Sequence, residues 1–400
     1  MKLPRTDSLA IRADGTDLSY SELAAEAGAV AQEIAASGAA RGSLVTIDPE
    51  PGLAFAVRLQ AIWSAGAVAW IAGSREEPLA GEDVAVRVET SGTTGTPRTV
   101  DLTHSNLAAS AEGTAFALGV AAEDRWLCCL PVRHVAGLSI LTRSAARGSA
   151  AVIHPRFEVE RVAESLQRDG ITLVSLVATQ LARLLEAGVD LTGPRAIVMG
   201  GGPVPADLLD DALSRGAAVI QSYGMTETAS QVALLPPALA RDKAGSAGPA
   251  LDGAEIRVDD GEVLVRGAMV SPSATLSGGW LRTGDLGRID AGGCLWVDGR
   301  RGDRIITGGE NVMPEEVEAA LEAHPDVIEA AVIGRPDPEW QEAVTAVVVL
   351  RAGATLFGDG LRAHCAERLA GFKVPKRFEE ASELPRTASG KLRRAELRRE

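Results

Sequence analysis

The chain has 400 residues, of which 46% are hydrophobic and 24% are charged, and its net charge is −14. A single hydrophobic core rarely organises more than ~250–300 residues, so this length predicts at least two domains and excludes a small single-module binding protein. The acidic balance argues against non-specific binding to nucleic acids or to membrane surfaces. The apolar run at residues 343–350 is far shorter than the ~20 residues that cross a bilayer, and residues 1–5 lead into no signal-peptide core. We therefore expect a cytoplasmic protein without membrane insertion.

The spacing of the cysteines and the small number of lysines both bear on the chemistry of this chain. The cysteines have no metal-ligand spacing and a chain of this size needs no disulfides, so we expect reduced thiols at Cys128, Cys129, Cys294 and Cys365. Of the 40 basic residues, 35 are arginines and only 5 are lysines. Arginine is the usual cation of this chain, so a lysine within a motif calls for an explanation.

Helix and strand patterns alternate through the first part of the chain. Ser19 and Glu22 have the spacing of a capping box, and the apolar residues that follow at helical spacing predict a helix that ends near Gly38. Strands that alternate with helices are typical of an α/β sheet architecture. Apolar runs predict such strands at residues 44–47, 84–88, 150–153, 196–199 and 217–220.

The pattern changes after residue 260. Short strands with Gly or Asp turns indicate a β-rich subregion at residues 262–266 and 287–297. A small α+β unit is predicted from helices at residues 314–323 and 361–369 and strands at residues 327–333 and 343–350, with a polar tail after them. The charged segment 298–303 has the composition of a linker. We expect a mixed α/β protein with an N-terminal domain at residues 1–299 and a smaller α+β domain at residues 300–400.

A segment rich in Gly, Ser and Thr at residues 90–98 follows the strand predicted at residues 84–88. Its glycines let backbone N–H groups point into one concavity, its hydroxyl groups add donors, and Arg98 adds a positive charge. This combination suits an oligophosphate. The segment is not a Walker A loop, because no Gly-Lys-Ser/Thr closes it. An ordinary surface loop is the alternative interpretation.

Two further segments follow predicted strands. Residues 200–202 are three glycines placed where open α/β sheets bind ligands. Tyr223, Thr226 and Glu227 offer an aromatic face for a base, a hydroxyl for a phosphate and a carboxylate for Mg²⁺. Gly224 is expected to permit a sharp turn between them. The alternatives are core packing for Tyr223 and a first-turn helix carboxylate for Glu227.

These segments resemble, in their order along the chain, the signature motifs of the adenylate-forming superfamily, which comprises acyl-CoA synthetases, luciferases and peptide-synthetase adenylation domains. Residues 281–286, 299–311 and 384–391 resemble three more of its motifs. The resemblance implies a large N-terminal domain and a small mobile C-terminal domain. It also implies a two-step reaction, in which a carboxylate and ATP give an acyl-adenylate and pyrophosphate, and a thiol then displaces AMP.

The resemblance implies roles for individual residues. Asp285, supported by Arg300, is expected to bind the ribose hydroxyls of ATP, and Thr226 and Glu227 are expected to serve the α-phosphate and Mg²⁺. Tyr223 is expected to frame the adenine together with Gly200, Gly201 and Gly202. The residues expected to contact the β- and γ-phosphates are Thr90, Ser91, Gly92, Thr93, Thr94, Gly95, Thr96 and Arg98.

The phosphate loop departs from the superfamily pattern at its end. The superfamily usually has Pro-Lys-Gly there, whereas this chain has Pro97, Arg98 and Thr99. Arg98 keeps the positive charge, but Thr99 restricts the backbone in a way that glycine does not.

Lys391 matches the catalytic lysine of the superfamily. It stands among five arginines between Arg386 and Arg399, so a site that needed only a solvated cation would be expected to have Arg. A compact ammonium suits a point contact with phosphoryl and carboxylate oxygens. A surface lysine in a basic tail is the alternative. The same resemblance makes Gly302 the hinge about which the C-terminal domain rotates between the half-reactions.

The same resemblance limits which acid and which thiol we expect as substrates. His134 matches a superfamily histidine that lies at the acyl pocket, with a satisfied core histidine as the alternative. Amino-acid-activating relatives have an aspartate near this segment, and residues 131–151 contain none. No carrier attachment motif follows Lys391, so coenzyme A is the expected thiol.

The short N-terminal region and residues 173–180 and 222–231 are most like the o-succinylbenzoate-CoA ligases of menaquinone biosynthesis. This resemblance implies an aromatic acid with a second carboxylate, which needs a cation or hydroxyl donors in its pocket. The alternatives are another aryl- or acyl-CoA synthetase and a non-catalytic nucleotide-binding homologue; a homo-oligomer is left open. The candidates to hold the second carboxylate are Arg143, Arg147, Arg195, Ser230 and Gln231.

Overall fold

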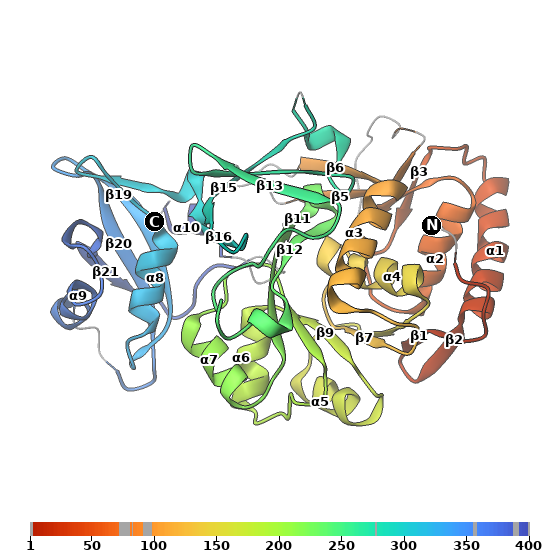
Figure 1. Ribbon diagram of the computed structural model, residues 1–400, viewed down its shortest axis with the longest axis horizontal. Coiled ribbons are helices and arrows are strands. Elements are labelled where there is room, and N and C mark those ends of the chain that lie inside the picture. Colours follow the sequence, from red (N-terminus) through yellow and green to blue (C-terminus); the bar gives the residue numbers. More distant parts are fainter. Residues whose placement is uncertain are drawn as a thin grey trace.

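The computed structural model describes residues 3–71, 81, 83–90, 98–276, 278–354, 358–386 and 392–398. Its larger part is built around a mixed sheet that is covered by helices on both faces, and a smaller α+β unit follows residue 303 at one end of the molecule (Figure 1). In the described part of the chain, no helix combines the length and the apolar character needed to cross a membrane.

The large sheet has the strand order β12-β11-β10-β9-β7-β8-β1-β2, and its inner strands run parallel. Along β7 and the residue that follows it, Trp126 and Cys128 belong to one core while Leu127 and Cys129 belong to the other. Because both faces are buried, the inner strands are continuous apolar runs, which the sequence shows plainly. The strands are β1 (Leu9–Ala13), β2 (Thr16–Ser19), β7 (Arg125–Cys128), β8 (Ala150–Ile153), β9 (Leu173–Leu176), β10 (Ala196–Met199), β11 (Val219–Met225) and β12 (Ser230–Leu234).

Helices α1 to α4 contribute to the core on one face of this sheet, and α5 to α7 contribute to the core on the other face. The capping box predicted for α1 is confirmed: the amide of Glu22 donates to Ser19 Oγ, and the Glu22 carboxylate accepts from the amide of Ser19. The helices are α1 (Tyr20–Ala36), α2 (Leu53–Ser64), α3 (His104–Leu118), α4 (Val135–Arg147), α5 (Val159–Arg168), α6 (Ala178–Glu186) and α7 (Ala206–Ser214).

Two smaller sheets flank the large one. The order β3-β4-β5-β6 ends in an antiparallel hairpin of β5 and β6, and the order β13-β14-β15-β16 is antiparallel throughout. The second of these sheets is the β-rich subregion that the sequence predicts. The strands are β3 (Leu44–Ile47), β4 (Val68–Ile71), β5 (Val84–Thr90), β6 (Arg98–Thr103), β13 (Ala254–Asp259), β14 (Glu262–Gly267), β15 (Leu281–Ile289) and β16 (Leu295–Arg300).

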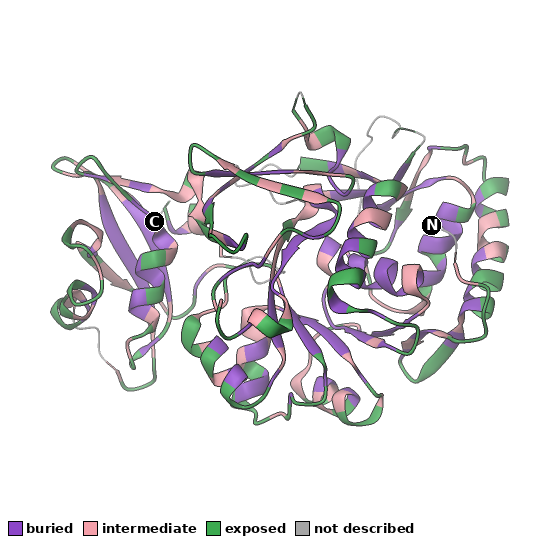
Figure 2. Ribbon diagram, in the orientation of Figure 1, coloured by how far each residue is buried: buried purple, intermediate pink, exposed green. Residues whose placement is uncertain are grey.

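The C-terminal unit is a sheet packed against helices. Its strand order is β18-β17-β20-β19, with β21 parallel to β20, and its central strands are buried (Figure 2). Its elements are β17 (Ile305–Thr307), β18 (Glu310–Val312), α8 (Pro314–Glu322), β19 (Val327–Asp337), β20 (Gln341–Leu350), α9 (Gly358–Ala366), β21 (Arg377–Glu380) and α10 (Arg394–Leu397).

Some helices, strands and connecting segments begin or end at residues other than those expected. The strand predicted at residues 217–220 is β11, which begins two residues later and continues to Met225, because β12 pairs with its far end. The helix predicted at residues 361–369 ends at Ala366. The segment predicted as a linker at residues 298–303 begins as strand, because β16 pairs with β15 as far as Arg300. The polar tail expected after the helix predicted at residues 361–369 contains two elements that the sequence did not predict, β21 and α10.

One half-buried carboxyl group of the C-terminal unit predicts a pH-dependent stability. Burial, together with the negative charges of Glu318, Glu329 and Asp207, raises the pKa of Glu322 to about 7, although the hydrogen bond from the amide of Ala330 lowers it. A raised folded-state pKa contributes stability that is present below about pH 4.5 and lost as the pH rises through about 7.

Glu322→Gln should therefore be more stable than the wild-type protein at pH 8 by up to roughly 3 kcal/mol, relative to any difference at pH 4.5. The amide oxygen can still accept from the amide of Ala330, as Glu322 Oε1 does at 3.3 Å. Chemical denaturation at both pH values checks this, with the exposed Glu367→Gln as control. An equal effect of Glu322→Gln at both pH values would contradict it.

Candidate active site

Several predicted site residues lie where the parallel strands of the large sheet end. Parallel strands have their carboxyl ends at one edge, and open α/β sheets bind ligands there. Gly200 directly follows β10, Tyr223 lies near the end of β11, and His134 follows β7 after a short turn. Ser222 Oγ donates to the carbonyl oxygen of Met199 at 2.7 Å, which joins the ends of β10 and β11. The sheet thus brings together segments that are far apart in the sequence.

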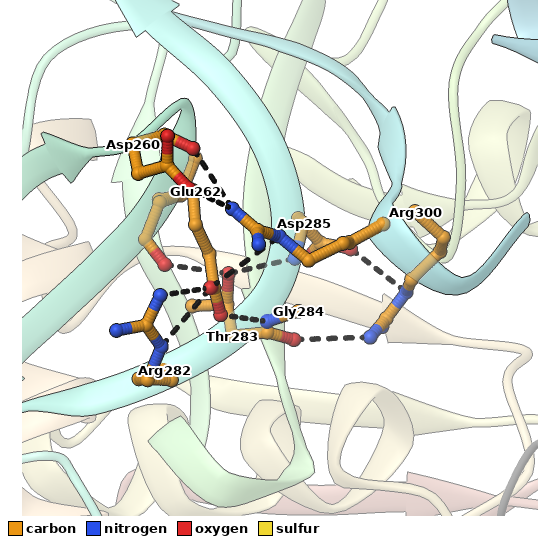
Figure 3. A network of polar contacts seen from close by, with 9 residues as sticks. Asp260, Glu262, Arg282, Thr283, Gly284, Asp285 and Arg300 are labelled. Atoms are coloured by element: carbon orange, nitrogen blue, oxygen red, sulfur yellow. Dashed lines mark hydrogen bonds and ion pairs between the residues drawn. The ribbon is translucent and has the colours of Figure 1, made fainter. Parts of the chain in front are cut away.

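Asp285 is buried, with 5% of its surface exposed, and its carboxylate contacts Tyr223 and Arg300. Tyr223 Oη donates to Oδ2 at 2.6 Å, and Arg300 Nε lies 2.7 Å from Oδ1. Arg300 also donates to the carbonyl oxygen of Thr283 at 3.1 Å (Figure 3). Burial and the charge of Asp285 raise the pKa of Tyr223, so its phenol stays protonated. The carboxylate is thereby fixed beside an aromatic ring at the sheet edge.

Asp285 reaches Tyr223 because β15 contains a bulge. Glu262 pairs with Leu286, and Leu264 pairs with Arg282, so β15 has two extra residues between these pairs. Gly284 lies within the bulge with a φ of 74°, a conformation that glycine adopts without steric cost. The bulge is closed by Thr283, whose hydroxyl accepts from the amide of Asp285 at 3.0 Å. The Thr-Gly-Asp sequence therefore sets the direction of the Asp285 side chain.

A second buried carboxylate supports this bulge from β14. Glu262 Oε1 accepts from the amide of Gly284 at 3.1 Å, and Oε2 accepts from Arg282 Nε at 3.0 Å. Burial alone would raise the pKa of Glu262, but the hydrogen bonds from Arg282 and Gly284 outweigh it and lower the pKa. Figure 3 shows Glu262 and Asp285 in one polar network. Nothing in the sequence pattern around Glu262 predicts this supporting role.

The segment after β11 forms a tight turn, η1 (Thr226–Thr228), before β12 begins. Thr228 Oγ1 accepts from the amide of Met225 at 3.0 Å and donates to the carbonyl oxygen of Ser230 at 2.7 Å. Ala229 and Ser230 have φ values of 52° and 117°, which non-glycine residues rarely adopt. Such conformations cost of order 1–3 kcal/mol each and are concentrated at functional sites. Thr226 and Glu227 therefore lie in a strained and closely held turn.

Glycine is required at position 224 for a different reason from the one expected. It lies within β11, opposite Gln231, and its φ is not in the left-handed region, so the prediction of a sharp turn at this residue is wrong. An added Cβ would lie 1.8 Å from the carbonyl oxygen of Ser230. Glycine is needed because the backbone of β12 passes directly over it.

Glu227 is joined to the β5–β6 hairpin through Ser271. The amide of Ser271 donates to the carbonyl oxygen of Glu227 at 2.7 Å, and its hydroxyl donates to the carbonyl oxygen of Asp101 on β6 at 2.7 Å. Thr90 and Arg98 pair at the far end of this hairpin. The turn that carries Glu227 is therefore connected to the hairpin that carries the predicted phosphate loop. Ser271 was not predicted, since its role depends on contacts between distant segments.

Some predicted site residues lie outside the described residues. They are Ser91, Gly92, Thr93, Thr94, Gly95, Thr96 and Lys391. Their roles stay predictions.

Comparison with known protein families gives matches in both parts of the chain. The family model described as AMP-binding enzyme matches residues 70–273, and the model described as AMP-binding enzyme C-terminal domain matches residues 316–391. The chain belongs to the AMP-binding enzyme family. The mixed α/β fold predicted from the sequence is confirmed by solved structures of this family.

The most similar relatives include 2-succinylbenzoate–CoA ligase of Bacillus velezensis, 43% identical over 336 residues, which are 79% of this chain and 69% of that protein. The o-succinylbenzoate CoA synthetase of Bacillus subtilis in complex with the acyl-adenylate intermediate OSB-AMP is 33% identical, with a TM-score of 0.90 over 98% of this chain and 95% of that chain. Its complex with ATP and magnesium ion is 34% identical, with a TM-score of 0.89 over 98% and 96%. A double mutant of it with the product analogue OSB-NCoA is 33% identical, with a TM-score of 0.70 over the same shares.

In this AMP-binding enzyme, His134 immediately precedes α4. Its Nε2 atom is buried and has no hydrogen-bond partner among the described residues. Burial lowers the pKa of His134, and the charge of Arg133 lowers it further, so the ring is neutral at pH 7. A buried ring nitrogen without a partner is expected where a ligand or water completes the site. This geometry is compatible with a place at the acyl pocket.

The three arginines considered as carboxylate anchors have different surroundings. Arg147 Nη2 lies 2.8 Å from a carboxylate oxygen of Glu112, and Arg195 Nη2 lies 2.6 Å from one of Asp124. Arg195 also precedes β10, so it lies at the opposite edge of the sheet from the site. Both of these guanidinium groups already have a carboxylate partner. The side-chain amide of Gln231 also has partners, because its oxygen accepts a hydrogen bond from Thr114 and its nitrogen donates one to Ser222.

Arg143 differs from both other arginines. It is 1% exposed, it donates to Ser230 Oγ at 3.1 Å, and its guanidinium lies 5.3 Å from the centre of the Trp126 ring. Burial lowers the pKa of Arg143 to about 9, so the group remains charged at pH 7. Among the described residues, its Nε has no hydrogen-bond partner and no carboxylate forms an ion pair with it. The sequence could name Arg143 as a candidate, but only the fold separates it from the others.

The remaining predicted residues lie at the edges of this site. Gly201 and Gly202 are exposed after β10, and Gly200 is half-buried beside Ser222. Gly302 is exposed within η4 (Arg301–Asp303), between the last strand of the β13–β16 sheet and the first strand of the C-terminal unit.

Proposed function

We propose that this chain is an ATP- and Mg²⁺-dependent acid–CoA ligase that converts o-succinylbenzoate to o-succinylbenzoyl-CoA through an acyl-adenylate, with release of AMP and pyrophosphate. The observation that carries the choice of acid is Arg143, a buried guanidinium that has no carboxylate partner among the described residues. The chain resembles o-succinylbenzoate CoA synthetase over 98% of its length. We place the reaction in the cytoplasm, where ATP and coenzyme A are both available.

The nucleotide would occupy the edge formed by β10, β11 and β15. The oriented carboxylate of Asp285, with Arg300 beside it, suits the two vicinal hydroxyls of ribose, which donate hydrogen bonds. The ring of Tyr223 and the backbone of Gly200, Gly201 and Gly202 would frame the adenine. Thr90 to Thr96 and Arg98 would hold the β- and γ-phosphates, and Thr226 the α-phosphate.

Glu227 fits the role of magnesium ligand. Within the described ranges, no group of three or more His, Cys, Asp or Glu side chains could form an all-protein metal site. Magnesium is commonly bound by one or two carboxylates together with substrate phosphates, which matches a lone carboxylate in the turn after β11. The ion would supply positive charge that neutralises the phosphates.

In the first half-reaction, the residues of this site would position the substrates and stabilise negative charge. A carboxylate is already ionised at pH 7, so its oxygen can attack the α-phosphorus without a general base, while the bond to pyrophosphate breaks. Lys391 and Arg98 would stabilise the negative charge that builds on the phosphoryl oxygens. In the second half-reaction the sulfur of coenzyme A attacks the acyl carbonyl, its proton is released, and the bond to AMP breaks.

The acid would lie beside His134, with its second carboxylate paired to Arg143. A charged guanidinium in the interior is strongly unfavourable unless an anion compensates it, and a carboxylate fits its planar fork. Ser230 already accepts from Arg143, so its own hydroxyl hydrogen is available for the same carboxylate.

The substrate prediction can be checked with a panel of acids. We expect pyrophosphate release with ATP, Mg²⁺ and coenzyme A to show its highest kcat/KM for o-succinylbenzoate. Aliphatic acids of about six to twelve carbons and benzoate derivatives with one carboxylate are the competitors. A higher kcat/KM for any of these would reject the acid but keep the ligase assignment. The absence of pyrophosphate release with every acid would reject both.

The hinge is also a proposal. We infer that residues 1–299 and 300–400 act as two domains that turn about Gly302 between the half-reactions. The higher TM-score to the acyl-adenylate complex than to the OSB-NCoA complex, 0.90 against 0.70, supports the view that the chain has the adenylate-forming orientation here.

Gly302→Pro is expected to impair one half-reaction more than the other. Proline fixes φ near −65° and removes an N–H group, so it would favour one domain orientation. Gly302→Ala is the matched control, because nothing lies within 4 Å of the position of its Cβ and φ is not in the left-handed region. Pyrophosphate release and thioester formation from supplied acyl-adenylate are measured separately. Equal losses in a folded Gly302→Pro protein would count against a hinge here.

A further inference from the structure

Arg394 lies three residues after Lys391 and makes several ion pairs, although its side chain is only 13% exposed. Its Nη2 lies 2.6 Å from Glu318 Oε2, and its Nε lies 3.3 Å from Glu318 Oε1. It also lies 3.3 Å from a carboxylate oxygen of Glu315 and 3.5 Å from one of Asp303. One arginine of the tail therefore joins three carboxylates of the C-terminal unit.

The chemistry of this cluster depends on an arginine. The pKa of Glu318 is raised, and that of Glu315 is raised to about 7, because burial of each carboxyl group outweighs the positive charge of Arg394. The planar fork can meet both oxygens of Glu318 and still reach Asp303, which a point-charge ammonium cannot do. Glu318 is itself fixed, because its Oε1 accepts from the amide of Val332 on β19 at 2.7 Å.

The other contacts of the tail fix the same stretch of chain. Leu392 forms a bridge with Arg386, and the amide of Arg393 donates to the carbonyl oxygen of Pro385 at 2.8 Å. Leu397 is buried in a small core with Ile333 and Leu384. Both chain ends that flank residues 387–391 are therefore attached to the C-terminal unit.

The cluster also reaches the residue after the proposed hinge. Asp303 directly follows Gly302 and takes ion pairs from Arg394 and, at 3.3 Å, from Arg398. A rotation about residue 302 would consequently carry the tail together with α8 and β19.

We propose that Arg394 is a positioning residue for adenylation: its ion pairs with Glu318 and Asp303 fix the chain next to Lys391 to the body of the C-terminal unit. This inference rests on the proposed function, because it assigns Lys391 to the adenylation step. Misplacing a reacting group by about 1 Å can cost roughly 100-fold in rate, so loss of the anchor should be measurable in kcat.

Two substitutions remove the anchor from opposite sides. Arg394→Met removes the cation, and Glu318→Gln keeps the shape of the side chain and an acceptor for the amide of Val332. Both should lower kcat for pyrophosphate release by roughly 10- to 100-fold with little change in the KM for ATP or acid. Thioester formation from supplied acyl-adenylate should change by less than about threefold, because it does not use Lys391. Arg377→Met, which removes an ion pair with Asp337 in the same unit, is the control.

A double-mutant cycle separates positioning from a merely structural role. In a Lys391→Ala background, Arg394→Met should change pyrophosphate release by less than about twofold, because residues that act as a unit are strongly non-additive. Equal losses in both backgrounds, or parallel losses in both half-reactions, would overturn the inference. If Arg394→Met does not fold, Glu318→Gln carries the same comparison.

Different experimental results would reject the proposed function and this inference. A wild-type protein that releases no pyrophosphate with any acid overturns both. An active wild-type protein whose Glu318→Gln variant has wild-type rates in both half-reactions overturns the inference alone.

Discussion

Lys391→Ala is expected to slow pyrophosphate release by roughly 10²–10³-fold, the loss seen when a group aimed at developing transition-state charge is removed. Negative charge builds on the α-phosphoryl oxygens as pyrophosphate departs, and a compact ammonium can meet it at one point. Thioester formation from a supplied acyl-adenylate should be largely retained, since the second step would use another domain orientation. Single-turnover measurements of each half-reaction check this result.

Lys391→Arg is the sharper test of the same idea. The guanidinium keeps the charge but is larger and planar, so it should not replace the ammonium at a point contact, and adenylation should be impaired. The neighbouring Arg393→Lys exchanges the same two residue types at a position whose side chain is paired with Glu396, and it serves as control. Wild-type adenylation by Lys391→Arg would mean that the tail is a generic basic segment.

Arg143→Met is expected to lower kcat/KM for o-succinylbenzoate by roughly 10²–10³-fold, mainly through KM. Truncating one partner of a buried charge pair costs about 2–5 kcal/mol. The folded protein itself should lose little stability, because methionine fills a similar volume and leaves no carboxylate of the described residues unpaired. Kinetics with the acid varied at saturating ATP measures the effect.

The control acid for Arg143 is 4-oxo-4-phenylbutanoate, which has the same skeleton without the ring carboxylate. Arg143→Met should change kcat/KM for this acid by less than about tenfold. Arg147 lies on the same helix as Arg143, and Arg147→Met removes an ion pair with Glu112 of α3. This change should leave the preference between the two acids unchanged. If Arg143→Met lowered the activity with both acids equally, Arg143 would be a structural residue and the second carboxylate would bind elsewhere.

The elements predicted best are those whose signals are local. The capping box of α1 and the apolar strands β8 and β10 follow from short-range pattern, because a buried parallel strand must be apolar on both faces. The elements β21 and α10 were missed for the opposite reason. β21 exists as a strand because β20 supplies its hydrogen-bond partners, and α10 is held by the ion pairs of Arg394 and the burial of Leu397. Neither has a distinctive sequence pattern.

The residues whose chemical groups suit ATP can be identified from sequence, since motifs such as Thr-Gly-Asp and Tyr-Gly-Met-Thr-Glu are contiguous. The sequence alone could not determine which of those groups meet. Tyr223 and Asp285 form a hydrogen bond because a bulge in β15 turns one toward the other, and Gly224 is required by a backbone that returns over it. The choice of Arg143 over Arg147 and Arg195 depends on burial and on which carboxylates lie nearby. These contacts arise from packing between segments that are distant in the sequence, so no local sequence pattern predicts them.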